Sequence, residues 1–136
     1  MNWEGISMKK GLITPIFLVI ILFACQAKED DLFFVGEGEY WSSNMTVYQS
    51  TGDETYQIEI NYKESNLQDI KYFNYYVKTK NNKVIDYAKN NASLTKQGTY
   101  HKHLPISNSP LISEKDEITI TIEWNGNSED FMLVYK

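Results

Sequence analysis

The C-terminal part of the chain carries the pattern that most constrains its fold, a strict alternation of apolar and polar side chains. The apolar members are Ile118, Ile120, Ile122 and Trp124, and the polar ones are Thr119, Thr121 and Glu123. A period of two predicts a strand with one buried face. Asn125-Gly126 follows and suits a type I′ hairpin turn, because both central residues of that turn take positive φ. The turn predicts a return strand over 127–135 that pairs Ile120 with Phe131 and Ile118 with Leu133.

Five other segments have a similar strand-like pattern. They span residues 40–49, 56–62, 70–78, 84–88 and 99–104. With the C-terminal hairpin they make about seven short strands, and no segment has a convincing helical pattern. This arrangement indicates an all-β fold, either a sandwich or a partial barrel. The domain expected over 33–136 is close to the roughly 100 residues of an immunoglobulin-like antiparallel β-sandwich, which is the predicted architecture.

The N-terminal segment has the layout of an export signal. Lys9 and Lys10 form a positively charged stretch, and an apolar run follows over 12–24. The run is too short to span a membrane as a helix, which takes about 20 residues, but it fits the apolar region of a signal peptide. We expect a signal-peptide helix over 1–24. Met8 is the expected true start, because Glu4 places an acid where the positive stretch belongs.

The apolar run ends in Leu22-Phe23-Ala24-Cys25, which resembles the lipobox of bacterial lipoproteins. In that family a leucine, a variable residue and a small residue precede an invariant cysteine, and Phe23 stands where a smaller residue is usual. The resemblance implies that the Cys25 thiol receives a diacylglyceryl group and that cleavage makes Cys25 the new N-terminus. Residues 25–32 are then a flexible tether. The alternatives are a lone buried cysteine behind an ordinary signal and an uncleaved membrane helix.

The domain also resembles small lipoproteins of Gram-positive bacteria that have immunoglobulin-like folds and no assigned activity. The resemblance lies in Gly36-Glu37-Gly38-Glu39-Tyr40-Trp41 after the tether and in the closing segment over 122–129. It implies an extracytoplasmic protein that is held by lipid at the outer face of the cytoplasmic membrane. Two acyl chains suffice for such an anchor, whereas one chain binds only marginally.

The charge of the chain argues against two kinds of partner. Every basic residue apart from the histidines is a lysine, whereas arginine supplies bidentate recognition of phosphates and bases. Its absence from an acidic chain argues against nucleic acid. Because Glu4, Lys9 and Lys10 precede Cys25, the rest of the chain carries 11 lysines against 17 acidic residues, a net charge of −6. Such a domain does not adhere to an anionic membrane by charge and needs its lipid.

The two histidines, His101 and His103, are separated by one residue on a predicted strand. This spacing places both imidazoles on one face, where they can hold a zinc or copper ion with a further ligand such as Asp86 or Glu114. The alternative is a solvated strand face. No cysteine besides Cys25 is available as a ligand, for a disulfide or as a catalytic thiol.

An aromatic run, formed by Tyr72, Phe73, Tyr75 and Tyr76, lies on one predicted strand. Tyrosines on the outer face of a strand can stack on sugar rings or on a partner protein. The alternative is that one aromatic set packs in the core while the other covers a neighbouring loop.

No catalytic motif accompanies these features. The chain has no Gly-x-Ser-x-Gly nucleophile elbow and no glycine-rich phosphate loop. We therefore expect no enzymatic activity and no cofactor, but a binding module at the cell surface whose partner is an envelope protein or a glycan. Two alternatives stay open: a metal-binding lipoprotein that uses His101 and His103, and a small hydrolase with an unrecognised site.

Overall fold

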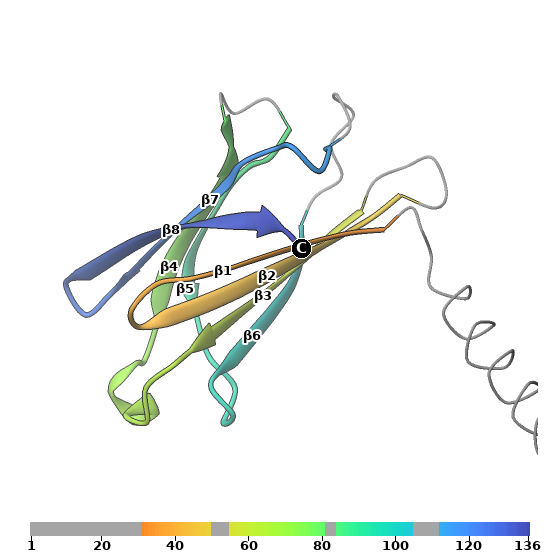
Figure 1. Ribbon diagram of the computed structural model, residues 1–136. Coiled ribbons are helices and arrows are strands. Elements are labelled where there is room, and N and C mark those ends of the chain that lie inside the picture. The colour runs from red at the N-terminus through yellow and green to blue at the C-terminus, as the bar shows by residue number, and fades with distance from the viewer. Residues whose placement is uncertain (1–30, 50–54, 81–83, 105–111) are drawn as a thin grey trace, which may run out of the picture.

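A computed structural model of the chain describes residues 31–49, 55–80, 84–104 and 112–136. These residues form an all-β structure of eight strands (Figure 1). The strands are β1 (Leu32–Glu37), β2 (Trp41–Tyr48), β3 (Thr55–Tyr62), β4 (Phe73–Thr79), β5 (Asp86–Ala92), β6 (Thr99–Leu104), β7 (Ile118–Trp124) and β8 (Asn127–Tyr135). A short 3₁₀ turn, η1 (Leu67–Asp69), precedes β4.

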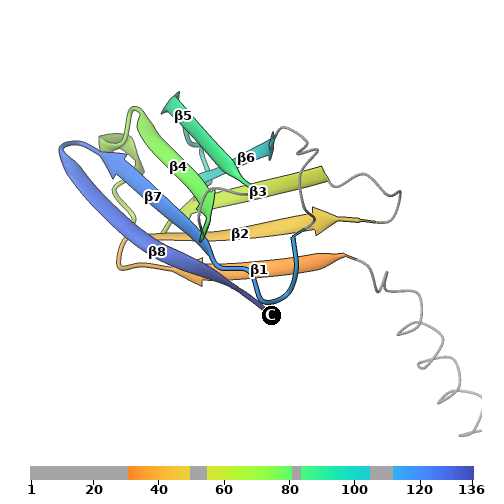
Figure 2. The same ribbon diagram turned by 90° about the horizontal axis from the view of Figure 1, so that it is seen from above.

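All eight strands belong to one antiparallel sheet, in the order β5-β4-β7-β8-β1-β2-β3-β6. The sheet curls on itself, so that β1, β2, β3 and β6 lie opposite β8, β7, β4 and β5 in a barrel-like arrangement (Figure 2). A short ladder between β1 and β8 joins the two halves, in which Phe34 pairs with Tyr135 and Val35 with Val134. The edge strands β5 and β6 face each other across the opening of the sheet.

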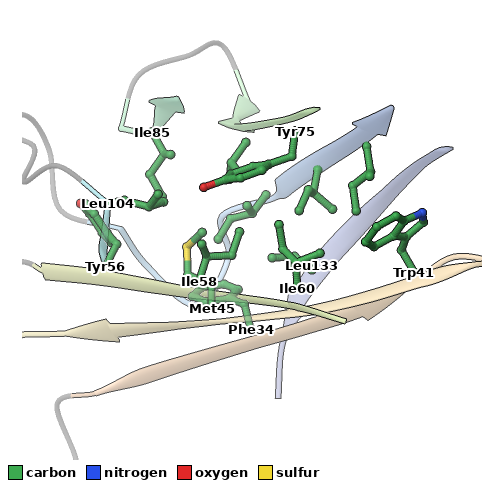
Figure 3. Packing of buried hydrophobic residues seen from close by; sticks show 14 of the residues in the cluster. Phe34, Trp41, Met45, Tyr56, Ile58, Ile60, Tyr75, Ile85, Leu104 and Leu133 are labelled. Atoms are coloured by element: carbon green, nitrogen blue, oxygen red, sulfur yellow. The ribbon is translucent and has the colours of Figure 1, made fainter. Parts of the chain in front are cut away.

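The core fills the space between the two halves of the sheet (Figure 3). Alternate residues of the central strands supply it, since successive side chains of a strand point to opposite faces. Fully buried members include Phe34, Met45, Ile58, Ile60, Ile118, Ile120, Ile122 and Leu133. On the side of the edge strands, Tyr75 of β4 and Tyr100 of β6 close the core through a 3.0 Å hydrogen bond between their hydroxyls. Burial of this apolar surface is the main force that stabilises the fold.

The C-terminal hairpin confirms its prediction. Ile120 pairs with Phe131 and Ile118 with Leu133, and all four side chains are buried. The turn Asn125-Gly126 has φ values of 47° and 77°, as a type I′ turn requires. Turn chemistry and hydrophobic pattern therefore select the same register, and they place the turn at one end of the molecule.

The other predicted strands are present, some with shifted ends. The strand predicted over 99–104 matches β6, and those over 40–49 and 56–62 match β2 and β3 to within one residue at each end. The segment 70–78 becomes β4 three residues later, because η1 and a bend precede it. The segment 84–88 becomes β5, which runs further toward the C-terminus.

The predicted all-β antiparallel fold is confirmed, but the structure differs from the predicted sandwich of about seven strands in two respects. It has eight strands, and they form one nearly closed, barrel-like sheet, as in the partial-barrel alternative. The missed strand is β1. Its apolar residues Phe33, Phe34 and Val35 are consecutive, so no period of two marks it. Because β1 pairs with both β2 and β8, it connects the two halves that a sandwich would keep apart.

The predicted signal-peptide helix over 1–24, the start at Met8 and the lipidation site Cys25 lie outside the described residues. The last residue of the predicted tether, Leu32, already belongs to β1 and is buried. No helix in the described part of the chain has the length and apolar character of a membrane span.

Candidate binding cleft

A cleft of about 640 Å³ opens at the end of the molecule where the hairpin of β7 and β8 turns. We call it the hairpin-end cleft. Its lining comes from four places: the turn between β1 and β2, the end of β3 with the residues that lead to η1, the end of β7, and the start of β8. Three aromatic rings, three asparagines and four carboxylates dominate this lining.

The aromatic rings of the cleft rest on the core. The ring centroids of Tyr40 and Trp124 are 5.7 Å apart. Behind them, Trp41 packs against Trp124 at 5.6 Å and against Tyr62 at 5.0 Å. Trp41 is fully buried and Trp124 is 8% exposed, whereas Tyr40 is 39% exposed. Aromatic pairs at such distances gain about 0.5–1.5 kcal/mol beyond burial, so the cleft presents an accessible tyrosine on a firmly packed base.

The indole N–H of Trp41 is buried and has no hydrogen-bond partner among the described residues. Figure 3 shows Trp41 at one end of the core, with its nitrogen on the side away from the other labelled residues. It lies next to the rings of Tyr62 and Trp124, which line the cleft. A buried donor without an acceptor costs roughly 1–3 kcal/mol. A hydrogen-bond donor without a partner among the described residues is therefore buried behind the rings of Tyr62 and Trp124.

Glu129 connects β8 to the turn between β1 and β2. Its two carboxylate oxygens accept hydrogen bonds from the backbone N–H of Tyr40, at 3.2 and 3.1 Å. Lys63, which follows β3, also binds this turn. Its ammonium donates to the Glu37 carboxylate and to the Gly38 carbonyl oxygen, each at 2.9 Å. An exposed ion pair of this kind contributes only about 0–1 kcal/mol. These contacts nevertheless hold Tyr40 in position and direct Lys63 to the turn.

The opposite wall is a chain of polar contacts. The Tyr62 hydroxyl donates to Asn66 Oδ1 at 3.0 Å, and Asn66 Nδ2 donates to Asp69 Oδ2 at 3.2 Å. Asn125 Nδ2 donates to the Asp69 carbonyl oxygen at 2.8 Å and so ties η1 to the hairpin turn. Burial raises the pKa of Tyr62 and outweighs the lowering effect of its hydrogen bond to Asn66. Tyr62 therefore presents a neutral hydroxyl at neutral pH.

The cleft is rich in acceptors and carries negative charge. Its carboxylates are Glu39, Asp69, Glu129 and Asp130, and no lysine or histidine belongs to its described lining. Carboxylates accept hydrogen bonds, while the asparagine amides both donate and accept. The one serine in the described lining, Ser128, has no histidine or lysine beside it there to act as its base. The arrangement is suited to holding a polar ligand by hydrogen bonds.

The structure gives the three tyrosines of the predicted binding site, Tyr72, Tyr75 and Tyr76, different surroundings. Tyr75 is 2% exposed and belongs to the core. Tyr76 lies on the outer face of β4, where its hydroxyl donates to the Asp86 carboxylate, and that bond raises its pKa. Tyr72 is 52% exposed at the end of the molecule that holds the cleft. Only Tyr72 is therefore placed to meet a ligand there.

His101 and His103 lie on the exposed side of the edge strand β6, opposite Glu59 and Gln57 of β3. Within the described residues, no group of three or more histidine, cysteine, aspartate or glutamate side chains is close enough to hold a metal ion. The proposed third ligand Asp86 lies on the other edge strand, β5, where it accepts the hydrogen bond from Tyr76.

Sequence reasoning missed the cleft itself. Its central residues come from segments that are far apart in the sequence: Tyr40, Tyr62, Asn66, Asn127 and Glu129. The one available signal was the clustering of aromatic and amide residues at both sides of the Asn125-Gly126 turn. That signal has no fixed spacing, because the partners are brought together by the sheet.

Comparison of the chain with protein-family models, with curated proteins and with solved structures gives no match.

Proposed function

We propose that this chain is an exported lipoprotein, anchored through Cys25 at the outer face of the cytoplasmic membrane of a Gram-positive bacterium. The apolar run over 12–24 and the lipobox that ends at Cys25 support this proposal. The net charge of −6 after Cys25 fits attachment by lipid rather than by charge. Because β1 begins at Leu32, seven residues after Cys25, the domain is held within about 25 Å of its anchor.

The domain acts as a non-enzymatic binding module, and the hairpin-end cleft is its ligand site. The observation that carries this proposal is the combination, in one cleft, of an accessible ring on a packed aromatic base with convergent amides and carboxylates. A concave site with a few fixed polar groups is the usual form of a small-ligand site. The cleft is also larger than three other hollows of the described residues, which measure about 260 to 440 Å³.

The ligand is a glycan of the cell envelope. A sugar hydroxyl both donates and accepts a hydrogen bond, and the cleft offers carboxylates that accept and amides that do both. The apolar face of a sugar ring can lie against the exposed ring of Tyr40. Like the sugar, the tyrosine combines an apolar face with a polar hydroxyl. The site can therefore satisfy the two faces of a sugar at once.

A peptide fits the cleft less well. Extended peptides commonly add to a free sheet edge, and helical ones fill an apolar groove. At the centre of the cleft, β7 is paired on both sides. β8 pairs with β1 only at Val134 and Tyr135, but the turn between β1 and β2 packs against its start, where Glu129 accepts from the backbone N–H of Tyr40. Neither strand therefore offers an open edge there. The lining is mainly polar, so it offers no apolar groove either.

The test is binding of the full chain, in detergent, to an array of glycans, followed by titration calorimetry with the best binder. Tyr40→Ala removes the stacking ring, so we expect about tenfold weaker binding. Asn127→Ala removes amide hydrogen bonds, so we expect a loss of about threefold to tenfold. Tyr48→Ala is the matched control, because Tyr48 is 38% exposed on β2 and does not line the cleft.

Thermal unfolding followed by circular dichroism checks that each variant is folded. If wild-type protein retains no glycan, or if Tyr48→Ala weakens binding as much as Tyr40→Ala, the cleft is not a glycan site and this proposal fails.

A further inference from the structure

A second hollow, of about 380 Å³, lies on the other side of the hairpin turn. It shares Trp124, Asn125, Asn127 and Ser128 with the hairpin-end cleft. Residues at the start of β4 and the end of β5 form its far side. We call it the Tyr72 hollow. The two hollows are therefore adjacent, and the turn Asn125-Gly126 is the ridge between them.

The Tyr72 hollow repeats the chemistry of the first one on a smaller scale. Tyr72 is 52% exposed, the highest value for an aromatic ring in the described residues. Asn74 Oδ1 accepts a hydrogen bond from the backbone N–H of Asn91 at 2.9 Å, and Asn91 takes a φ of 57°. This contact fixes the far wall of the hollow and leaves the Asn74 NH₂ group available to donate. An exposed ring thus again stands beside amide groups.

No large side chain on the Asn125-Gly126 turn stands between the two hollows. Gly126 has no side chain, and a Cβ added there meets no atom within 4 Å. Trp124 and Asn127 line both hollows. A ligand chain can therefore continue across the turn from one hollow to the other.

We infer that the two hollows are consecutive subsites for one glycan chain, so that the ligand is an uncharged oligosaccharide or polysaccharide rather than a single sugar. This inference rests on the proposed function, in which the hairpin-end cleft binds a glycan. Tyr40 serves the first subsite and Tyr72 the second. Linking two weak contacts through one ligand raises the overall affinity, because the second contact forms at a high effective concentration.

The charge of the surface selects the class of glycan. Glu39, Asp69, Glu129 and Asp130 line the first subsite and Glu123 lines the second. No lysine belongs to the described lining of either hollow. Phosphate-bearing or uronate polymers would meet like charge there, which is unfavourable. The subsites therefore take neutral chains and disfavour anionic ones.

The test measures affinity against ligand length. The full chain in detergent is titrated with chito-, cello-, malto- and manno-oligosaccharides of one to six sugar units. For the series that binds, we expect the tetramer to bind about tenfold more tightly than the dimer. Tyr72→Ala is expected to remove this gain and to leave dimer affinity within twofold of wild type. Tyr40→Ala is expected to weaken every length, and Tyr48→Ala none.

The outcomes separate the inference from the proposal on which it rests. Binding that does not depend on length, or a Tyr72→Ala variant that keeps the tetramer gain, overturns the two-subsite arrangement and leaves the first site intact. An oligogalacturonate that binds as tightly as the neutral chains overturns the charge selection. Absence of binding by every series and by the array, or binding of a lysine-rich peptide alone, overturns both the inference and the proposed function.

Discussion

Tyr75 is buried against Tyr100, a residue 25 positions away in the sequence. Its ring is 2% exposed and lies 5.3 Å from the ring of Tyr100 between centroids, and the two hydroxyls are hydrogen-bonded. Desolvation by burial, with the hydrogen bond to Tyr100, raises the pKa of Tyr75 well above the ordinary value of 10.0. The sequence analysis leaves open which aromatic residues of this strand are in the core, and the fold shows that Tyr75 is one of them and closes the open side of the sheet.

The stability of the domain is expected to fall in alkali because of Tyr75. The unfolded phenol loses its proton near pH 10, whereas the folded one keeps it. The stabilisation is therefore fully present below pH 10 and is lost as the pH rises further. Above pH 10, we expect the unfolding free energy of wild type to fall about 1.4 kcal/mol per pH unit more steeply than that of Tyr75→Phe. Urea unfolding curves between pH 8 and 11 measure both slopes.

At neutral pH, Tyr75→Phe loses one hydrogen bond and is expected to be less stable by about 1 kcal/mol. Equal alkaline slopes in the two proteins would show that Tyr75 ionises without unfolding.

Among the strands, β1 is the one that joins the two halves into a single sheet, because it pairs with both β2 and β8. Its ladder to β8 holds two register pairs, against six to β2, so the junction of the two halves is narrow. Gly36 lies beside this junction, and a Cβ there would overlap the carbonyl oxygen of Met132 on β8. A glycine is needed at this position because the backbone of β1 lies very close to the backbone of β8. The hydrophobic pattern of the sequence does not predict this close approach.

Two glycine substitutions test this reading of the junction. Gly36→Ala forces β1 away from β8 and is expected to destabilise the domain by about 3 kcal/mol. Gly126→Ala meets open space but adopts a φ of 77°, so only backbone strain of about 1 kcal/mol is expected. Urea denaturation compares the two with wild type. If the two variants lost equal amounts of unfolding free energy, the close approach of β1 and β8 would not be important for stability.

Local features of the molecule were predictable from the sequence, whereas features that depend on contacts between distant residues were not. The hairpin register followed from two local facts, the alternation over 118–124 and the Asn125-Gly126 turn, and both act within a few residues. The cleft depends on Glu129 meeting the backbone of Tyr40 and on Asn125 meeting η1. These contacts join residues that are 89 and 56 positions apart. Pattern reasoning gives the face of a strand but not its neighbours, so the strands were predictable and the site was not.

For the whole molecule, the proposed anchor and the proposed binding site lie at different places. β1 begins at Leu32 and runs to its turn with β2, which lines the cleft. Leu32 and the hairpin-end cleft therefore lie at opposite ends of β1 (Figure 1). With the proposed anchor seven residues before Leu32, the cleft would lie at the end of β1 that is further from the membrane. This arrangement suits capture of an envelope polymer.

Replacing Cys25 is expected to abolish lipid attachment without changing the domain. Cys25→Ser is nearly isosteric but cannot form the thioether, so no labelled fatty acid should be incorporated. The precursor should keep the apolar run over 12–24, because the peptidase acts on lipidated substrate. Metabolic labelling with palmitate and intact-mass measurement check both points.

Membrane fractionation alone does not decide the matter, because the uncleaved apolar run can itself retain the precursor. Thermal unfolding of the variant should match wild type, since the described core begins at Leu32. Ala92→Ser, a substitution in the domain at a buried site, is the matched control and should keep its label. Wild-type protein without label would show that Cys25 is not the anchor and would remove the support that the lipobox gives to a location at the cell surface.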